Sequence, residues 1–159
     1  MPYDDQPAAA SDVENINPPL DECGMAKAAR LLEDRWTMLI IREALYGVTR
    51  FDAMQSDLHI PRTVLADRLK RLCANGILTK RDYREPGQRT RSQYVLTSPG
   101  VELAVPMIAL MQWGDKNLGQ NQPAVEIVDR HDEKPCRVGF INFNGEPVNV
   151  GDIQLKKSG

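Results

Sequence analysis

The basic residues between Ile60 and Thr97 are of types, and at spacings, that could bind a negatively charged partner. From Arg35 to Pro99 the sequence holds twelve Lys or Arg residues and six Asp or Glu residues. The segments 1–34 and 100–159 are both acidic, and the whole chain has a net charge of −2. Positive charge confined to one segment of a near-neutral chain is typical of polyanion binding. The charge pattern therefore predicts contacts between these cations and phosphate groups.

A helix from Pro61 to about Ala74 positions the first of these cations. Leu69 and Leu72, with either Val64 or Leu65, recur at helical spacing and predict the inward stripe. Proline is well suited to the first turn of a helix, because its missing N–H is not needed there. The opposite face carries cations beside small side chains: Arg62, Thr63, Ala66, Asp67, Lys70 and Arg71.

The residues after Asn75-Gly76 change from a helical period to a period of two. Segments 77–83 and 91–97 are predicted to be two strands of a hairpin, with the turn at 85–88. Its arms carry further basic residues: Lys80, Arg81, Arg84, Arg89 and Arg91.

Three further helices are predicted before this hairpin. One begins at Asp21 or Glu22 and runs through Asp34, and a buried central helix follows and ends at Gly47 as a left-handed cap. A short helix, RFDAMQSDL, comes next, with Thr49 as its cap. The helices, the helix from Pro61 and the basic hairpin occur in the order of a winged helix-turn-helix.

The flanking segments complete the expected architecture. Residues 1–20 are rich in proline and acid and predict a mobile tail. A long helix should run from a Ser98 cap to about Leu118 with a kink at Pro106, and it is apolar enough to indicate a dimer interface.

The expected fold class is α+β and mainly helical, with terminal dimerisation helices and a small C-terminal β appendage. The predicted units are a tail at 1–20, a DNA-binding and dimerisation domain at 21–118 and a β-rich extension at 119–159, where Asn144-Gly145 signals a hairpin turn.

Double-stranded DNA is the polyanion that such an arrangement fits. Lys and Arg neutralise phosphates, while a helix with small exposed residues can approach base edges in the major groove. The residues predicted to contact DNA are Arg50, Arg62, Thr63, Ala66, Asp67, Arg68, Lys70, Arg71, Arg84, Arg89 and Arg91.

Other functional classes find little support in the sequence. It has no phosphate-binding loop, serine-hydrolase elbow or zinc-protease motif, so we expect no enzyme. No apolar run is long enough for a membrane span and no signal peptide is evident, which predicts a cytoplasmic protein. A winged helix used for protein contact remains an alternative, although it would call for a less basic recognition helix.

The chain resembles the HxlR-type winged-helix regulators of bacteria, which are related to the MarR type. The resemblance extends from Cys23 to about Leu118. It rests on R-W-T-x-L-I-I-R-E-x-L-x-G from Arg35, I-x-x-x-x-L-A-D-R-L-x-x-L from Ile60, N-G-I-L from Asn75 and Y-x-L-T-x-x-G from Tyr94, with W-G at Trp113. It implies a homodimeric regulator on a roughly palindromic operator, with DNA affinity controlled by a small aromatic or electrophilic effector.

Candidate residues for the effector or redox site are Cys23, Trp36 and Met111. The resemblance places its characteristic cysteine at Cys23, where a helix N-terminus would favour a thiolate, although Asp21 and Glu22 oppose one. A thiol-based redox sensor is therefore one alternative, and a packing or pocket role for Cys23 is the other. No cofactor is expected. Some members of the family that the chain resembles end in a small zinc-ribbon-like unit with cysteines before G-E-P, but here Asn144 stands in place of such a cysteine and only Cys136 remains, so no metal is expected either.

Overall fold

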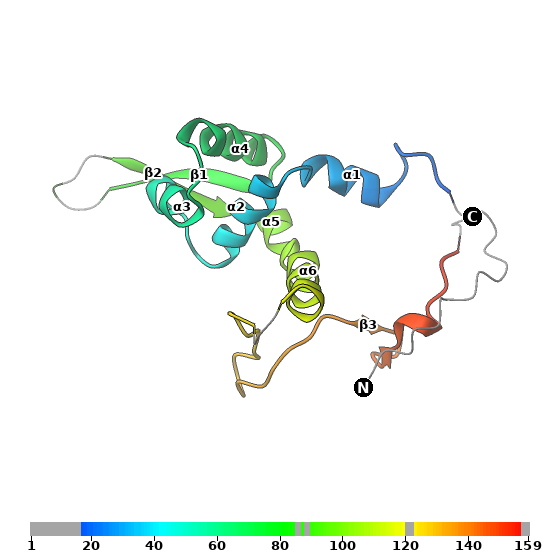
Figure 1. The fold of residues 1–159 in the computed structure, drawn as a ribbon. Coiled ribbons are helices and arrows are strands. Elements are labelled where there is room, and N and C mark those ends of the chain that lie inside the picture. Colours follow the sequence, from blue (N-terminus) through cyan, green and yellow to red (C-terminus); the bar gives the residue numbers. More distant parts are fainter. Residues whose placement is uncertain (1–16, 85–86, 88–89, 120–122, 157–159) are drawn as a thin grey trace.

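The fold consists of a helical body, a two-stranded wing and an extended C-terminal segment (Figure 1). The computed structural model describes residues 17–84, 87, 90–119 and 123–156. The elements are α1 (Gly24–Leu31), α2 (Arg35–Leu45), α3 (Phe51–Leu58), α4 (Arg62–Ala74), β1 (Leu78–Tyr83), β2 (Arg91–Leu96), α5 (Ser98–Glu102), α6 (Ala104–Asn117), β3 (Phe140–Ile141), β4 (Pro147–Val148) and the 3-10 turn η1 (Val150–Asp152). The order of α2 to β2 is that of a winged helix-turn-helix, as the sequence predicted.

The hydrophobic core lies where α2, α3 and α4 meet the base of the wing. The predicted stripe of α4 is confirmed, because Leu65, Leu69 and Leu72 are all buried. Ile40 and Ile41 of α2 meet them there. Burying a side chain of this size contributes roughly 1.5–3 kcal/mol. This core fixes α4 and presents its opposite face to solvent.

The junction between α1 and α2 differs from the prediction. The first helix begins at Gly24 rather than at Asp21 or Glu22, and it ends at Leu31 rather than continuing through Asp34. Asp34 is the N-cap of α2, and its carboxylate accepts hydrogen bonds from the backbone N–H groups of Trp36 and Thr37. A residue in this extended capping conformation cannot also continue a helix. In Figure 1, α1 extends away from the body of the domain.

Three other predicted helix starts were displaced by one position. Arg50 rather than Thr49 is the N-cap of α3, and the Thr49 hydroxyl bonds the Gln93 side chain at 3.3 Å instead. Pro61 is the N-cap of α4 rather than its first residue. Thr97 rather than Ser98 caps α5, where its hydroxyl accepts from the Gly100 N–H at 3.2 Å.

The predicted long helix after the wing is divided in two. The break lies at Leu103, not at Pro106 where a kink was expected. Proline has no N–H to donate to the carbonyl four residues earlier, which here belongs to Glu102. The helix therefore stops at Glu102, and Pro106 lies in the first turn of α6, where no N–H is required.

The wing is the predicted hairpin with an addition at its base. Strands β1 and β2 are antiparallel, with Leu78 opposite Leu96 and Tyr83 opposite Arg91. The Tyr94 N–H also donates to the Thr49 carbonyl at 2.8 Å, beside a bridge between Arg50 and Gln93. The sequence did not predict this third, very short strand. It ties the start of α3 to the wing.

One side chain of α6 bonds the C-terminal segment at two points. The Gln112 amide donates to the Cys136 carbonyl at 2.9 Å and accepts from the Val138 N–H at 3.0 Å. Beyond it, β3 and β4 form the predicted hairpin, and Gly145 has the positive φ of 82° that its turn requires. The predicted tail at 1–20 lies mostly outside the described residues. Within the described part of the chain, no helix is long and apolar enough to cross a membrane.

Candidate nucleic-acid interface

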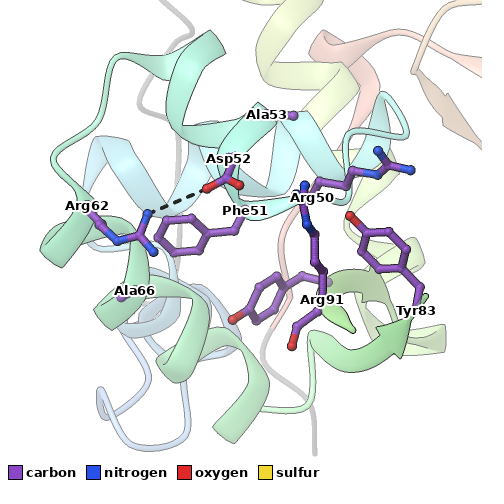
Figure 2. Close-up of a pocket in the computed structure, with 10 residues that line it drawn as sticks. Arg50, Phe51, Asp52, Ala53, Arg62, Ala66, Tyr83 and Arg91 are labelled. Atoms are coloured by element: carbon purple, nitrogen blue, oxygen red, sulfur yellow. Dashed lines mark ion pairs between the residues drawn. The ribbon is translucent and has the colours of Figure 1, made fainter. Parts of the chain in front are cut away.

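A hollow of about 730 Å³ lies between α3, α4 and the wing. Figure 2 shows three arginines around it, Arg50 before α3, Arg62 on α4 and Arg91 on β2. Ala66 of α4 also lines the hollow. Three guanidinium groups around one open cavity can bind an extended anion, because arginine pairs readily with phosphate and carboxylate oxygens.

Arg62 lies at the start of α4, where two neighbours position its side chain. Its guanidinium is stacked over the Phe51 ring at 4.8 Å from the centroid and is 3.6 Å from an Asp52 carboxylate oxygen. The side chains of Arg62 and Asp52 are 71% and 76% exposed. An ion pair this exposed is weak, so Arg62 is oriented by α3 yet can exchange Asp52 for another anion.

Arg50 and Arg91 face the hollow from the wing side. The Arg50 guanidinium is stacked over the Tyr83 ring at 4.8 Å from the centroid. Tyr83 is directly opposite Arg91 in the strand register. An aromatic ring and a cation therefore lie side by side at the end of the wing strands. Arg84, which follows Tyr83, is also exposed. Arg89 lies outside the described residues.

The outward face of α4 is as predicted from its period. Thr63, Ala66, Asp67 and Lys70 are all exposed beside Arg62. Figure 2 shows Ala66 one turn after Arg62 on the same helix. Small side chains at this face allow close approach of a helix to a groove.

Arg68 and Arg71 are instead paired with carboxylates before α2. Arg68 Nε donates to Asp34 Oδ2 at 2.9 Å, and its guanidinium also bonds Asp67. Arg71 forms an ion pair with Glu33, which raises the pKa of its guanidinium. The sequence assigned both arginines to phosphates or the minor groove, whereas in the structure both join α4 to the junction of α1 and α2.

Several residues of the hollow were missed by sequence reasoning. The ring of Phe51, the first residue of α3, supports Arg62. Tyr83 and Tyr94 were counted as strand residues, although both line the cavity. The alternation of residues along β1 indicates which face of the wing Tyr83 lies on. The stacking of Arg50 on Tyr83 joins residues far apart in the sequence, so no spacing could have predicted it.

The effector and redox candidates lie in different places. Met111 lines a second, apolar cavity of about 430 Å³ between α2 and α6, whereas Trp36 and Cys23 are not among its lining residues. Trp36 is stacked under Arg35 at 4.3 Å and packs at the edge of the core. Cys23 is the partly buried N-cap of α1. Burial raises the pKa of the Cys73 thiol, which outweighs the opposing charge of Lys80.

Comparisons with known proteins agree with this geometry. HTH-type transcriptional regulator Rv3095 of Mycobacterium tuberculosis is 39% identical over 94 residues, which cover 59% of this chain and 58% of that regulator. The chain thus matches little more than half the length of this regulator. An HTH-type transcriptional regulator of Bacillus subtilis, YvaP, is 35% identical over 88 residues, covering 55% of this chain and 80% of the relative.

The solved structure of PA1607, a candidate transcription factor, matches with a TM-score of 0.74 and 27% identity, and the match covers 86% of this chain and 96% of that one. The family description HxlR-like helix-turn-helix matches residues 31–122, more than half of the sequence. The chain therefore belongs to the HxlR-like helix-turn-helix family of transcriptional regulators.

Proposed function

We propose that this protein binds double-stranded DNA as a homodimer and regulates transcription from a roughly palindromic operator. In this proposal α4 enters the major groove, with Arg62, Thr63, Ala66, Asp67 and Lys70 facing it. The observation that supports this proposal best is the convergence of Arg50, Arg62 and Arg91 around one hollow beside α4. A phosphate backbone running between the recognition helix and the wing would occupy that hollow. Arg84 and Arg89 of the wing would contact phosphates or the minor groove further along.

The proposal can be tested by fluorescence anisotropy with the DNA upstream of the protein's own gene. Affinity would be measured across a salt series for wild type, Arg62→Ala and Arg130→Ala. Arg130 is an exposed arginine of the C-terminal segment, so its substitution changes net charge equally without touching the hollow. Each phosphate contact contributes about 0.9 to the slope of log affinity against log salt.

We expect Arg62→Ala to weaken binding and reduce that slope by about one, and Arg130→Ala to leave both unchanged. Equal losses in both variants would mean that net charge, not this site, governs binding. Failure to bind any DNA at low salt would favour the protein-contact alternative.

The homodimer is supported by apolar residues that α5 and α6 leave uncovered. Leu110 and Trp113 are 53% and 57% exposed, and Val101 and Val105 are also open to solvent. Several large apolar side chains exposed on neighbouring helices of a single chain are typical of an interface. Sedimentation equilibrium of Trp113→Asp should give a monomer, while Phe143→Asp in the loop between β3 and β4 should remain dimeric. A monomeric wild type would contradict the proposal.

Control of DNA affinity by a small aromatic or electrophilic molecule belongs to the same proposal. The alternative is a thiol switch at Cys23, supported by its place at the N-cap of α1. Solved relatives include a reduced form of the transcriptional regulator YodB from B. subtilis, with a TM-score of 0.52 and 28% identity over 63% of this chain and 98% of that chain. If Cys23→Ser still releases DNA on treatment with diamide, Cys23 is not the switch.

A further inference from the structure

We propose that the cavity between α2 and α6 binds a neutral, planar, mainly apolar molecule that carries one hydrogen-bond acceptor. This inference rests on the proposed control of DNA affinity by a small molecule and gives that molecule a site and a chemical class. The cavity of about 430 Å³ falls within the range of small-molecule sites in proteins.

The walls of the cavity are almost entirely apolar and unusually adaptable. Met38 of α2 faces Met107 and Met111 of α6 across it. Methionine side chains are flexible and polarisable, and their sulfur atoms make favourable contacts with aromatic rings. Further apolar residues of the two helices also line it: Leu39, Leu45, Ala104, Ile108 and Leu110. These walls favour a flat ring over a branched or strongly polar molecule.

A single hydroxyl group provides the hydrogen-bonding chemistry. Tyr46, at the C-terminal end of α2, donates its hydroxyl to Met111 Sδ at 3.5 Å. A thioether is a weak acceptor, so a carbonyl oxygen of a ligand would be a better partner for this donor. The exchange costs little, because Met111 needs no hydrogen bond when it packs against a ring.

The charge of the cavity argues against an acidic ligand. Arg42 also lines the cavity, but its guanidinium is paired with the carboxylate of Glu43. Glu43 is buried, with only 4% of its surface exposed. A ligand carboxylate that drew Arg42 away would leave Glu43 buried and without its partner. Leaving a buried charge unpaired is strongly unfavourable, so a neutral ligand is preferred.

The cavity and the proposed dimer face lie mostly on different sides of α6. Residues 104, 107, 108 and 111 line the cavity at helical spacing, whereas Val105 and Trp113 are exposed and are not among its lining residues. Leu110 lines the cavity and is also exposed, so the two surfaces meet there. The third wall is Ile127, in the C-terminal segment that Gln112 holds against α6. Its carbonyl accepts from the Cys136 N–H at 2.7 Å, which closes the loop behind it. The C-terminal segment thereby becomes part of the binding site.

Isothermal titration of the full chain without DNA tests the proposal independently of operator binding. The probes are 2-acetylnaphthalene, a ring with one carbonyl acceptor, and 2-naphthoate, the same ring with a charge. The variants are Ala104→Phe, which fills the cavity, Tyr46→Phe, which removes the hydroxyl, and Tyr83→Phe, a matched loss of hydroxyl in the other hollow.

We expect the ketone to bind at least tenfold more tightly than naphthoate. Binding should be about fivefold weaker in Tyr46→Phe, in keeping with one hydrogen bond, and unchanged in Tyr83→Phe. It should be lost in Ala104→Phe, with circular dichroism confirming that this variant is folded. Ketone binding that is absent, equal to that of naphthoate, or unaltered in Tyr46→Phe would overturn the proposal, whether or not the protein binds DNA.

Discussion

Arg68 on α4 and Asp34 at the start of α2 form an ion pair, with 2.9 Å between Nε and Oδ2. Asp34 is at the same time the cap of α2, because its carboxylate accepts from the Trp36 and Thr37 N–H groups and from the Thr37 hydroxyl. One carboxylate therefore fixes the beginning of α2 and the middle of α4. The proposed DNA-binding helix is oriented by the residue that also separates α1 from α2.

Asp34→Ala should lower the free energy of unfolding by about 1–2 kcal/mol, the usual range for loss of a helix cap. Loss of the Arg68 partner adds to the effect. Urea denaturation followed by circular dichroism would measure it. Asp57→Ala, at an exposed position of α3, is the matched control and should change little. Equal effects at the two positions would mean that Asp34 has no special role.

The pH dependence of stability should carry the signature of Asp34. Burial opposes ionisation, but the hydrogen bonds from Thr37, the charge of Arg68 and the Trp36 N–H outweigh it and hold the pKa of Asp34 below its ordinary value. A carboxyl whose pKa is lower in the folded state adds stability above its unfolded value of about 3.9. That contribution is lost as the pH falls through the folded value.

Asp34→Asn isolates this charge, because asparagine caps helices about as well as aspartate. The difference in unfolding free energy between wild type and Asp34→Asn should be largest near pH 7 and shrink below about pH 4. Urea titrations at a series of pH values would measure it. A difference that stayed constant with pH would show that the charge of Asp34 is not responsible.

Gly100→Ala should destabilise the joint between the wing and α5. A Cβ atom at Gly100 would lie 2.2 Å from the Ile77 carbonyl oxygen, which is backbone and cannot rotate away. We expect a loss of about 1–3 kcal/mol, as for overpacking elsewhere. Gly114→Ala in α6 meets nothing within 4 Å and should instead stabilise the chain by about 0.5–1 kcal/mol. Thermal unfolding of the two variants should move in opposite directions.

Asp52→Asn should strengthen DNA binding if the hollow holds a phosphate. The substitution removes a negative charge 3.6 Å from Arg62 and leaves the shape of the side chain unchanged. The gain should be about two- to fivefold, the scale of an exposed ion pair, and should fade at high salt. Anisotropy titrations with Asp57→Asn as the control would measure it. A weaker complex would indicate that Asp52 is needed to hold Arg62 in place.

Periodicity predicted the parts of the fold that depend on a single element. The leucine stripe of α4, the two wing strands and the left-handed Gly47 at φ 83° are all confirmed. Helix starts were harder, since serine, threonine and aspartate near a boundary compete for the cap, and the choice between Thr97 and Ser98 depends on the N–H that each hydroxyl can reach. Asp34 was assigned to the end of the first helix, because the residues on both sides of it have helical patterns. In the structure its carboxylate bonds the N–H groups of the next helix instead.

Long-range contacts could not be predicted from spacing. Arg68 looks like any other cation of a basic helix until the fold brings Asp34 beside it. The stacking of Arg50 on Tyr83 likewise joins residues that are adjacent only after the wing has formed. The sequence therefore predicted a basic surface. The structure divides its arginines into those around the hollow and those paired with the carboxylates of Glu33 and Asp34 before α2.

Met111, Gln112 and Trp113 are consecutive in α6 yet face three different surroundings: the apolar cavity, the C-terminal segment and solvent. Successive residues of a helix point in directions about 100° apart, so the position of each residue along α6 determines which surface its side chain faces. Inserting or deleting one residue upstream of Met111 would rotate all three onto the wrong surfaces together. Evolution can therefore vary the chemistry of α6 by substitution, whereas changes in its length must come in near-whole turns.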